Sequence, residues 1–143
     1  MNILLVEDSV ERIVLFYQAL QKHNFVVATS ADAAIPLVES VPFDLIYLDY
    51  DLGGRVFVPI KDTNTGYRVA QALRGHSCNE GATVVVHSMN PVGSCACRDL
   101  LTNGGYEVYL HPFGTFVIES LTQSIMKKRM TKKKEKADET ASV

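Results

Sequence analysis

Four carboxylates of this sequence follow two short apolar runs and could together bind a metal ion. Glu7 and Asp8 end the first run, and Asp49 and Asp51 follow the second. The carboxyl ends of parallel strands meet at one edge of a sheet, where these carboxylates would repel one another without a cation. Mg²⁺ or Mn²⁺ suits such oxygen ligands. We therefore predict a metal site for phosphate chemistry, with Asp49 as its central ligand and Asp51 offering its backbone carbonyl.

Two histidines and two hydrogen-bonding residues follow the next apolar runs. They are His87, Ser88, Asn90 and His111. A histidine beside carboxylates can transfer protons or bind phosphate oxygens, and Ser88 and Asn90 can donate hydrogen bonds to developing negative charge. In a regular strand His87 and Ser88 point to opposite faces, so one alone enters the pocket unless the following turn bends the chain. A buried, hydrogen-bonded His87 is the alternative to a catalytic one.

The elements that must position these residues alternate between short apolar runs and amphipathic segments. Strands are expected at residues 2–6, 25–29, 45–48, 83–87 and 106–110, and helices at 10–22, 31–40, 65–74, 94–101 and 115–129. Such a β-α series predicts an α/β fold, a doubly wound, parallel five-stranded sheet with helices on both faces. Ligands of such folds bind outside the carboxyl ends of the strands.

Charge divides the 143 residues into an acidic domain and a basic tail. Residues 1–126 carry seven Lys or Arg against thirteen Asp or Glu, whereas residues 127–143 carry seven against three. We expect one domain over 1–126 and a disordered tail over 127–143. The tail either contacts nucleic acid or an acidic partner, or is a solvated helix end that frays.

Cysteine usage and hydropathy favour the cytoplasm. No apolar run approaches the length of a membrane span, and no secretory signal is visible at the N-terminus. Three cysteines without a CxxC pair, Cys78, Cys95 and Cys97, are typical of free thiols in a reducing compartment.

Four separated motifs resemble a known family. They are LDYDLGG at 48–54, TGYRVA at 65–70, HSMNPVG at 87–93 and PFG at 112–114. Residues 1–126 resemble a response-regulator receiver domain, and these motifs resemble the cyclic-phosphate-processing receiver domains. The resemblance implies a flavodoxin-like (CheY-like) sheet of order 2-1-3-4-5. It also implies that Glu7 and Asp8 are the acidic pair, Asp49 the phosphoacceptor position and Ser88 the switch residue.

The sequence departs from ordinary receivers in three places. His111 stands where receivers have a lysine, Val108 replaces the aromatic switch residue, and the loop from Asp49 to Gly66 is longer than usual. These departures count against ordinary phosphorelay switching. The resemblance to the cyclic-phosphate-processing receivers implies a metal-dependent phosphoesterase acting on a small molecule or nucleotide with a cyclic phosphate. The alternatives are a stand-alone receiver phosphorylated on Asp49 by a histidine kinase, and a degenerate receiver that only binds proteins. The long loop, residues 53–64, is a candidate lid or a passive surface loop.

Overall fold

The computed structural model describes residues 1–141, which fold into a parallel sheet covered by helices on both faces. The elements in chain order are β1 (Asn2–Val6), α1 (Val10–Leu20), β2 (Asn24–Ala28), α2 (Ala31–Ser40), β3 (Leu45–Leu48), α3 (Gly66–Gly75), β4 (Thr83–Val86), α4 (Pro91–Asn103), β5 (Glu107–Leu110) and α5 (Ile118–Ala141). The strand order is β2-β1-β3-β4-β5, and every pairing is parallel. The predicted doubly wound CheY-like fold is confirmed.

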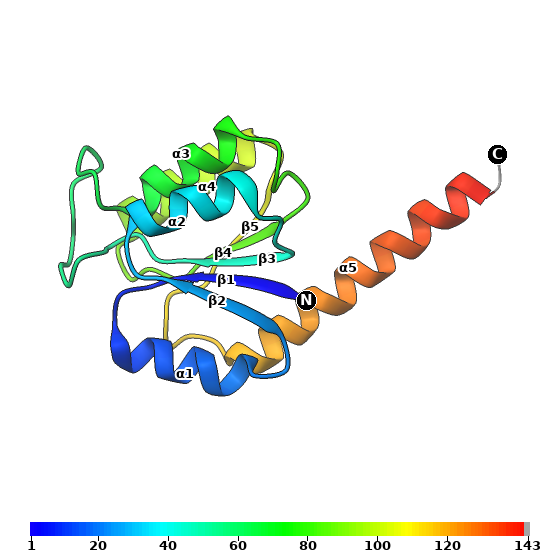
Figure 1. Ribbon diagram of the computed structural model, residues 1–143, viewed down its shortest axis with the longest axis horizontal. Coiled ribbons are helices and arrows are strands. Elements are labelled where there is room, and N and C mark those ends of the chain that lie inside the picture. The colour runs from blue at the N-terminus through cyan, green and yellow to red at the C-terminus, as the bar shows by residue number, and fades with distance from the viewer. Residues whose placement is uncertain (142–143) are drawn as a thin grey trace.

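Two apolar clusters lie on the two faces of the sheet. Val6 and Leu48 face α2, α3 and α4, whereas Leu5 and Tyr47 face α1 and α5 (Figure 1). Alternate side chains of the central strands therefore enter opposite clusters, and both faces are buried, which explains their continuous apolar runs. Apart from the Tyr47 hydroxyl, which is hydrogen-bonded to Thr122 at 2.6 Å, the polar side chains of the central strands lie at the strand ends.

Helix boundaries follow side-chain caps. Ser9, Ser30 and Thr65 each accept a hydrogen bond from a backbone N–H of the first turn of α1, α2 and α3. Asn90 caps α4 in the same way, and Pro91 takes the first helical position. Because proline is favoured at that position, α4 begins three residues before the predicted start at 94.

The basic segment is helical up to Ala141, contrary to the disordered tail that we expected; residues 142–143 lie outside the described part of the chain. Lys128 and Lys132 form ion pairs with Glu107 of the edge strand β5, and Arg129 pairs with Asp44. Those distant acidic partners fix the middle of α5, and its Lys, Glu and Ala residues favour continued helix. The last turns of α5 project from the domain (Figure 1).

Two further expectations concern the membrane and the thiols. Among residues 1–141, none of the helices combines the length and apolar character needed to cross a membrane. The three cysteines are free, with Cys97 buried and the other two partly exposed.

Candidate functional site

The register of the sheet aligns four of the predicted site residues. Val6 of β1, Leu48 of β3, Val86 of β4 and Leu110 of β5 are successive partners across the sheet. The next residue of each strand is a candidate: Glu7, Asp49, His87 and His111. Since the partners face α2, α3 and α4, alternation directs these four candidates toward the α1 and α5 side.

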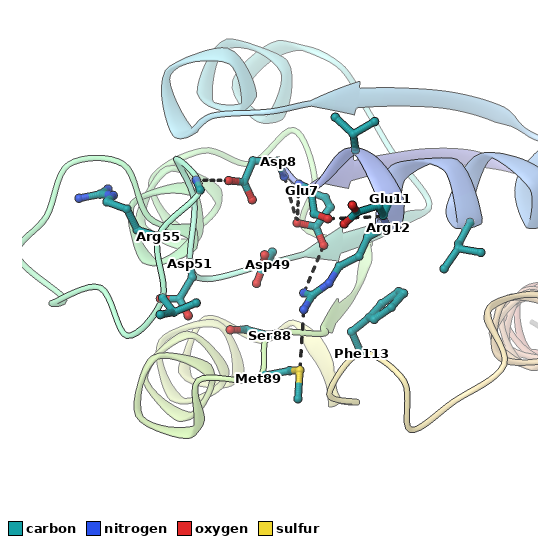
Figure 2. A pocket seen from close by; sticks show the side chains of 15 residues that line it. Glu7, Asp8, Glu11, Arg12, Asp49, Asp51, Arg55, Ser88, Met89 and Phe113 are labelled. Carbon is teal, nitrogen blue, oxygen red and sulfur yellow. Dashed lines mark hydrogen bonds and ion pairs between the residues drawn. The ribbon is translucent and has the colours of Figure 1, made fainter.

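A cavity of about 780 Å³ opens at this carboxyl edge (Figure 2). Its polar lining includes Glu7, Asp8, Arg12, Asp49, Asp51 and Ser88. Apolar side chains surround them, among them Val10 and Leu15 of α1, Val56 of the long loop, Met89 and Phe113. The cavity therefore combines a charged floor with an apolar rim.

Glu7 and Asp49 are buried carboxylates at the centre of this floor. Glu7 is 0% exposed and Asp49 4% exposed. Glu7 Oε2 accepts the N–H groups of Asp8 at 3.0 Å and Ser9 at 3.3 Å. Burial alone would raise the pKa of Glu7, but the hydrogen bond with His87 and the backbone N–H of Ser9 outweigh it and the pKa is lowered. Glu7 is therefore ionised.

Asp49 has the opposite charge state. Burial, and then the neighbouring charge of Glu7, raise the pKa of Asp49 from 3.8 to about 8. Two adjacent carboxyl groups out of water cannot both ionise without a compensating cation, so Asp49 keeps its proton at neutral pH. The pair carries one negative charge and could accept a cation in exchange for that proton.

Three residues are close enough to share one metal ion. Ligand atoms of Glu7, Asp49 and His87 all lie within 4.8 Å of one another. His87 Nε2 is already directed at Glu7 Oε1, so the carboxylate oxygens are the donors that face the cavity. Hard oxygen donors and an uncompensated charge fit Mg²⁺ or Mn²⁺.

The other two predicted ligands also line the cavity, but each is bound to the long loop. The Asp8 carboxylate accepts the N–H of Gly54. Asp51 Oδ1 accepts the N–H of Val58 at 2.9 Å and faces Asn90 Nδ2 at 3.4 Å. The four carboxylates thus form an inner pair, Glu7 and Asp49, and an outer pair that holds the loop.

His87 and Ser88 point to opposite faces, so the bend that would admit both to the cavity does not occur. His87 is fully buried, with its ring centroid 5.2 Å from that of Phe16 and 6.3 Å from that of Tyr47. Burial lowers the pKa of His87, so its ring is neutral and Nε2–H donates to Glu7 at 3.2 Å. His87 therefore orients Glu7, and the structure does not place it for the proton transfer that we expected.

Ser88 and Asn90 have different positions. Ser88 lines the cavity, and its Oγ accepts the N–H of Asn90 at 3.1 Å. Asn90 is buried, and its Oδ1 accepts the N–H of Gly93 at 3.1 Å, as the cap of α4. Ser88 remains a candidate hydrogen-bond donor to a ligand, whereas Asn90 acts through Asp51 and the start of α4.

His111 does not line the cavity, contrary to its expected role there. It lies two strands from Asp49, which separates the backbones by about 10 Å. Its ring stacks on Tyr109, with centroids 6.2 Å apart, and packs against Phe116 at 5.7 Å. The imidazole is too short to span that distance.

The peptide bond that precedes Pro112 is trans, as are all others in residues 1–141.

Arg12 is a charged cavity residue that the sequence analysis missed. Its guanidinium carbon lies 4.8 Å from the centre of the Phe113 ring, and Nη1 is 3.5 Å from Glu7 Oε1 (Figure 2). Side chains of a helix lean toward its N-terminus, so a long residue in the first turn of α1 reaches over the edge of the sheet. Its place three residues after the cap Ser9 was the signal available in the sequence.

The long loop forms one wall of the cavity and is tied to the domain at its base. An isolated bridge pairs Asp51 with Thr65, and the buried Tyr50 hydroxyl donates to the carbonyl of Val58 at 2.7 Å. Within the loop, Arg55 binds Asp62 through two hydrogen bonds of 2.9 and 3.0 Å. Gly54, Arg55 and Val56 line the cavity, so this loop restricts what can enter it.

Solved structures similar to this chain are receiver domains. A CheY-like receiver domain protein from Methanospirillum hungatei superimposes with a TM-score of 0.67 at 17% identity, covering 94% of this chain and 97% of that one. The receiver domain of a Pseudomonas aeruginosa sensor histidine kinase, with a magnesium ion in its active-site cleft, gives 0.64 at 18%, covering 88% and 94%. A Burkholderia pseudomallei response regulator with a phosphorylated aspartic acid, a calcium ion and citrate gives 0.64 at 19%, covering 96% and 74%.

The sequence itself gives a narrower match. No curated protein is found to match the chain. A family model described as the cyclic-phosphate processing receiver domain matches residues 2–103, which include β1 to α4 and every cavity residue except Phe113. The chain belongs to the family of cyclic-phosphate-processing receiver domains.

Proposed function

We propose that this chain is a receiver-fold domain that uses Mg²⁺ or Mn²⁺ to bind and hydrolyse a cyclic phosphate. The observation that carries the proposal is the buried pair of carboxyl groups of Glu7 and Asp49, which lie within 4.8 Å of each other at the floor of an open cavity. Membership of the cyclic-phosphate-processing family supports the substrate class. The magnesium ion in the cleft of the Pseudomonas receiver supports the metal.

Glu7 and Asp49 would hold the metal, joined by Asp8 if its carboxylate leaves the Gly54 N–H. A bound divalent ion would polarise a phosphoryl oxygen. His87 keeps Glu7 in place through its Nε2–H, and Asp49 would release its proton to solvent on binding the cation. Ser88 can donate its hydroxyl hydrogen to a phosphoryl oxygen, since Oγ otherwise only accepts from Asn90.

Hydrolysis of a cyclic phosphate forms a P–O bond to the oxygen of an attacking water molecule and breaks one P–O bond of the ring, whose leaving oxygen takes a proton. Neither His87 nor His111 lines the cavity, so the proton donor of this scheme is a water molecule in the open cavity. The apolar rim of Val10, Leu15 and Met89 would contact the organic part of the substrate. That rim suits a nucleoside or another partly apolar alcohol better than a free sugar.

A signalling role is the second candidate. Asp49 and Ser88 line the same cavity, and a similar response regulator carries a phosphorylated aspartic acid. Under this alternative a histidine kinase would phosphorylate Asp49. His111 stands where receivers have a lysine, and its imidazole lies outside the cavity, which counts against this alternative.

One experiment separates the two candidates. The protein is incubated with Mg²⁺ and a panel of nucleoside cyclic phosphates, and ring opening is followed by phosphorus NMR. Parallel samples with a small phosphodonor are examined by intact-mass spectrometry. The control pair is Asp49→Asn and Asp32→Asn, which make the same carboxyl-to-amide change in the cavity and at an exposed site.

Ring opening that is lost with Asp49→Asn or a chelator, and kept with Asp32→Asn, supports the phosphoesterase. A phosphoryl adduct lost only with Asp49→Asn, without ring opening, supports the receiver alternative. A protein that binds Mg²⁺ but gives neither product contradicts both.

A further inference from the structure

A phosphate group at this cavity needs a cationic side chain, and two candidates exist. Arg12 and Arg55 are the basic residues of the lining, which contains neither lysine nor histidine within the described chain. Phosphoryl oxygens are bound most strongly by charge-assisted hydrogen bonds, and the guanidinium fork fits two of them at once. The question is which of the two arginines can offer its N–H groups.

Arg55 is already occupied. Its Nη1 and Nη2 donate to the two carboxylate oxygens of Asp62 at 2.9 and 3.0 Å, and Nε donates to the carbonyl of Leu52 at 3.4 Å. Its main partner is thus a carboxylate of the same loop, bound in the two-point geometry that a phosphate would otherwise take.

Arg12 has looser partners. Nη1 lies 3.5 Å from Glu7 Oε1, longer than a normal charge-assisted bond, and Nη2 lies 3.7 Å from the thioether sulfur of Met89. The Glu7 carboxylate has closer hydrogen-bond donors, which are the backbone N–H groups of Asp8 and Ser9 and the ring of His87. A phosphoryl oxygen could therefore replace either of these two partners of Arg12.

The position of Arg12 is nevertheless fixed. Its guanidinium lies over the ring of Phe113, 4.8 Å from the centroid, and its side chain is only 28% exposed. A guanidinium over a ring face directs its N–H groups outward past the ring, and Figure 2 shows Arg12 reaching into the space between Asp49 and Phe113. The apolar rim limits solvent around this charge and strengthens its attraction for an anion.

We infer that Arg12 is the residue that binds the phosphoryl oxygens of the ligand, with Phe113 as its positioning platform. The inference rests on the proposed phosphate function, in either its hydrolytic or its signalling form. The cation of this site thus comes from the first turn of α1.

The test measures binding of the metal and of phosphate separately. Isothermal titration is carried out with Mg²⁺ alone, and then with inorganic phosphate and with a nucleoside cyclic phosphate at saturating Mg²⁺. The variants are Arg12→Ala, Arg12→Lys, Arg55→Ala and the control Arg98→Ala, which removes an arginine paired with its exposed neighbour Asp99. Circular dichroism and thermal melts establish that each variant is folded.

We expect Arg12→Ala to weaken phosphate binding by about tenfold or more, the loss typical of a charged hydrogen-bond donor. Mg²⁺ binding should be kept or become tighter, because a positive charge near Glu7 and Asp49 is removed. Arg12→Lys should lie between Arg12→Ala and the wild type, since lysine keeps the charge without the fork. A loss of Mg²⁺ affinity that parallels the loss of phosphate affinity would instead assign Arg12 a role in positioning Glu7.

Two results overturn the inference. If Arg12→Ala binds phosphate as tightly as the wild type, Arg12 is not the residue that binds the phosphoryl oxygens. If Arg55→Ala loses more phosphate affinity than Arg12→Ala, that residue is Arg55. These results leave the proposed function intact, because the wild type still binds phosphate. A wild type that binds Mg²⁺ but neither phosphate probe contradicts the proposed function together with the inference.

Discussion

His87 Nε2 and Glu7 Oε1 lie 3.2 Å apart, and both side chains are completely buried. The histidine has no access to the cavity, and its Nδ1 is the one buried side-chain nitrogen or oxygen of residues 1–141 without a hydrogen-bond partner. Its chemical effect must therefore pass through Glu7.

Replacement of His87 by alanine should weaken Mg²⁺ binding through loss of the orientation of Glu7. Partners that orient a metal ligand typically contribute about 10–100-fold to affinity. The cavity left among Phe16 and Tyr47 should also lower the free energy of unfolding by about 2–4 kcal/mol. Calorimetric titration with Mg²⁺ and chemical denaturation measure the two effects.

The matched control is His111→Ala, which removes an imidazole from the corresponding position of β5, outside the cavity. Its Mg²⁺ affinity should equal that of the wild type. If both variants lose Mg²⁺ affinity equally, then His87 does not act by orienting Glu7 and His111 does more than pack against Phe116.

The second prediction concerns pH. In the folded, metal-free chain Asp49 holds its proton up to about pH 8, whereas its ordinary pKa in the unfolded chain is 3.8. The folded state binds more protons between these values, so the stability that Asp49 contributes is complete below 3.8 and is lost as pH rises through 8. The loss should be on the order of 3 kcal/mol, after allowance for other groups that titrate.

Asp49→Asn removes this titration with little change of shape. Thermal melts from pH 5 to pH 9 should show the wild type losing stability relative to the variant, and saturating Mg²⁺ should reverse that difference for the wild type alone. Parallel curves for the two proteins without metal would show that Asp49 is ionised throughout and is not coupled to Glu7.

Much of this site could be predicted from where apolar runs end. Glu7, Asp49, His87 and His111 each follow the last residue of a strand, and the register places them in one row. Periodicity and turn residues are local, so the fold and this row follow from the sequence. Whether a side chain in this row reaches the cavity depends on the distance between strands and on the length of the side chain. By this criterion the His111 side chain does not reach the cavity.

The parts that could not be predicted depend on contacts between distant segments. Arg12 enters the cavity because α1 packs beside Phe113, 101 positions later in the chain. Lys128 and Lys132 of α5 meet Glu107 of β5, and no local pattern encodes that partner. Burial of His87 likewise follows from three aromatic rings brought from separate elements.

A third prediction uses two glycines of helix α3. A Cβ added at Gly66 would lie 2.1 Å from the carbonyl oxygen of Asp49 and 2.9 Å from Tyr50 Cα, so Gly66→Ala must displace the backbone that carries Asp49. A Cβ at Gly75, the last residue of the same helix, meets nothing within 4 Å. We expect Gly66→Ala to lower the free energy of unfolding by about 1–3 kcal/mol and to weaken Mg²⁺ binding.

Gly75→Ala should leave Mg²⁺ binding unchanged and stabilise the chain slightly, since alanine favours helix by up to about 1 kcal/mol. Urea denaturation and Mg²⁺ titration of both variants test the contrast. Wild-type metal binding in Gly66→Ala would mean that the backbone of Asp49 is free to relax.

The last prediction concerns the loop that forms one wall of the cavity. Tyr50 is fully buried, and its hydroxyl donates to the carbonyl of Val58 at 2.7 Å, which anchors this loop to the core. Tyr50→Phe should lower the free energy of unfolding of the whole domain by about 1 kcal/mol. Because the lost bond belongs to the loop, amide hydrogens of residues 53–64 should exchange faster while those of the sheet stay protected.

Tyr106→Phe is the matched control, because the Tyr106 hydroxyl donates to the carbonyl of Leu73 at 2.8 Å in another part of the fold. A similar overall cost is expected there, without faster exchange in residues 53–64. Hydrogen exchange read by mass spectrometry decides between the outcomes. If Tyr50→Phe leaves the loop as protected as in the wild type, then Asp8, Asp51 and the Arg55–Asp62 pair hold it without Tyr50, and the wall of the cavity is more rigid than a lid requires.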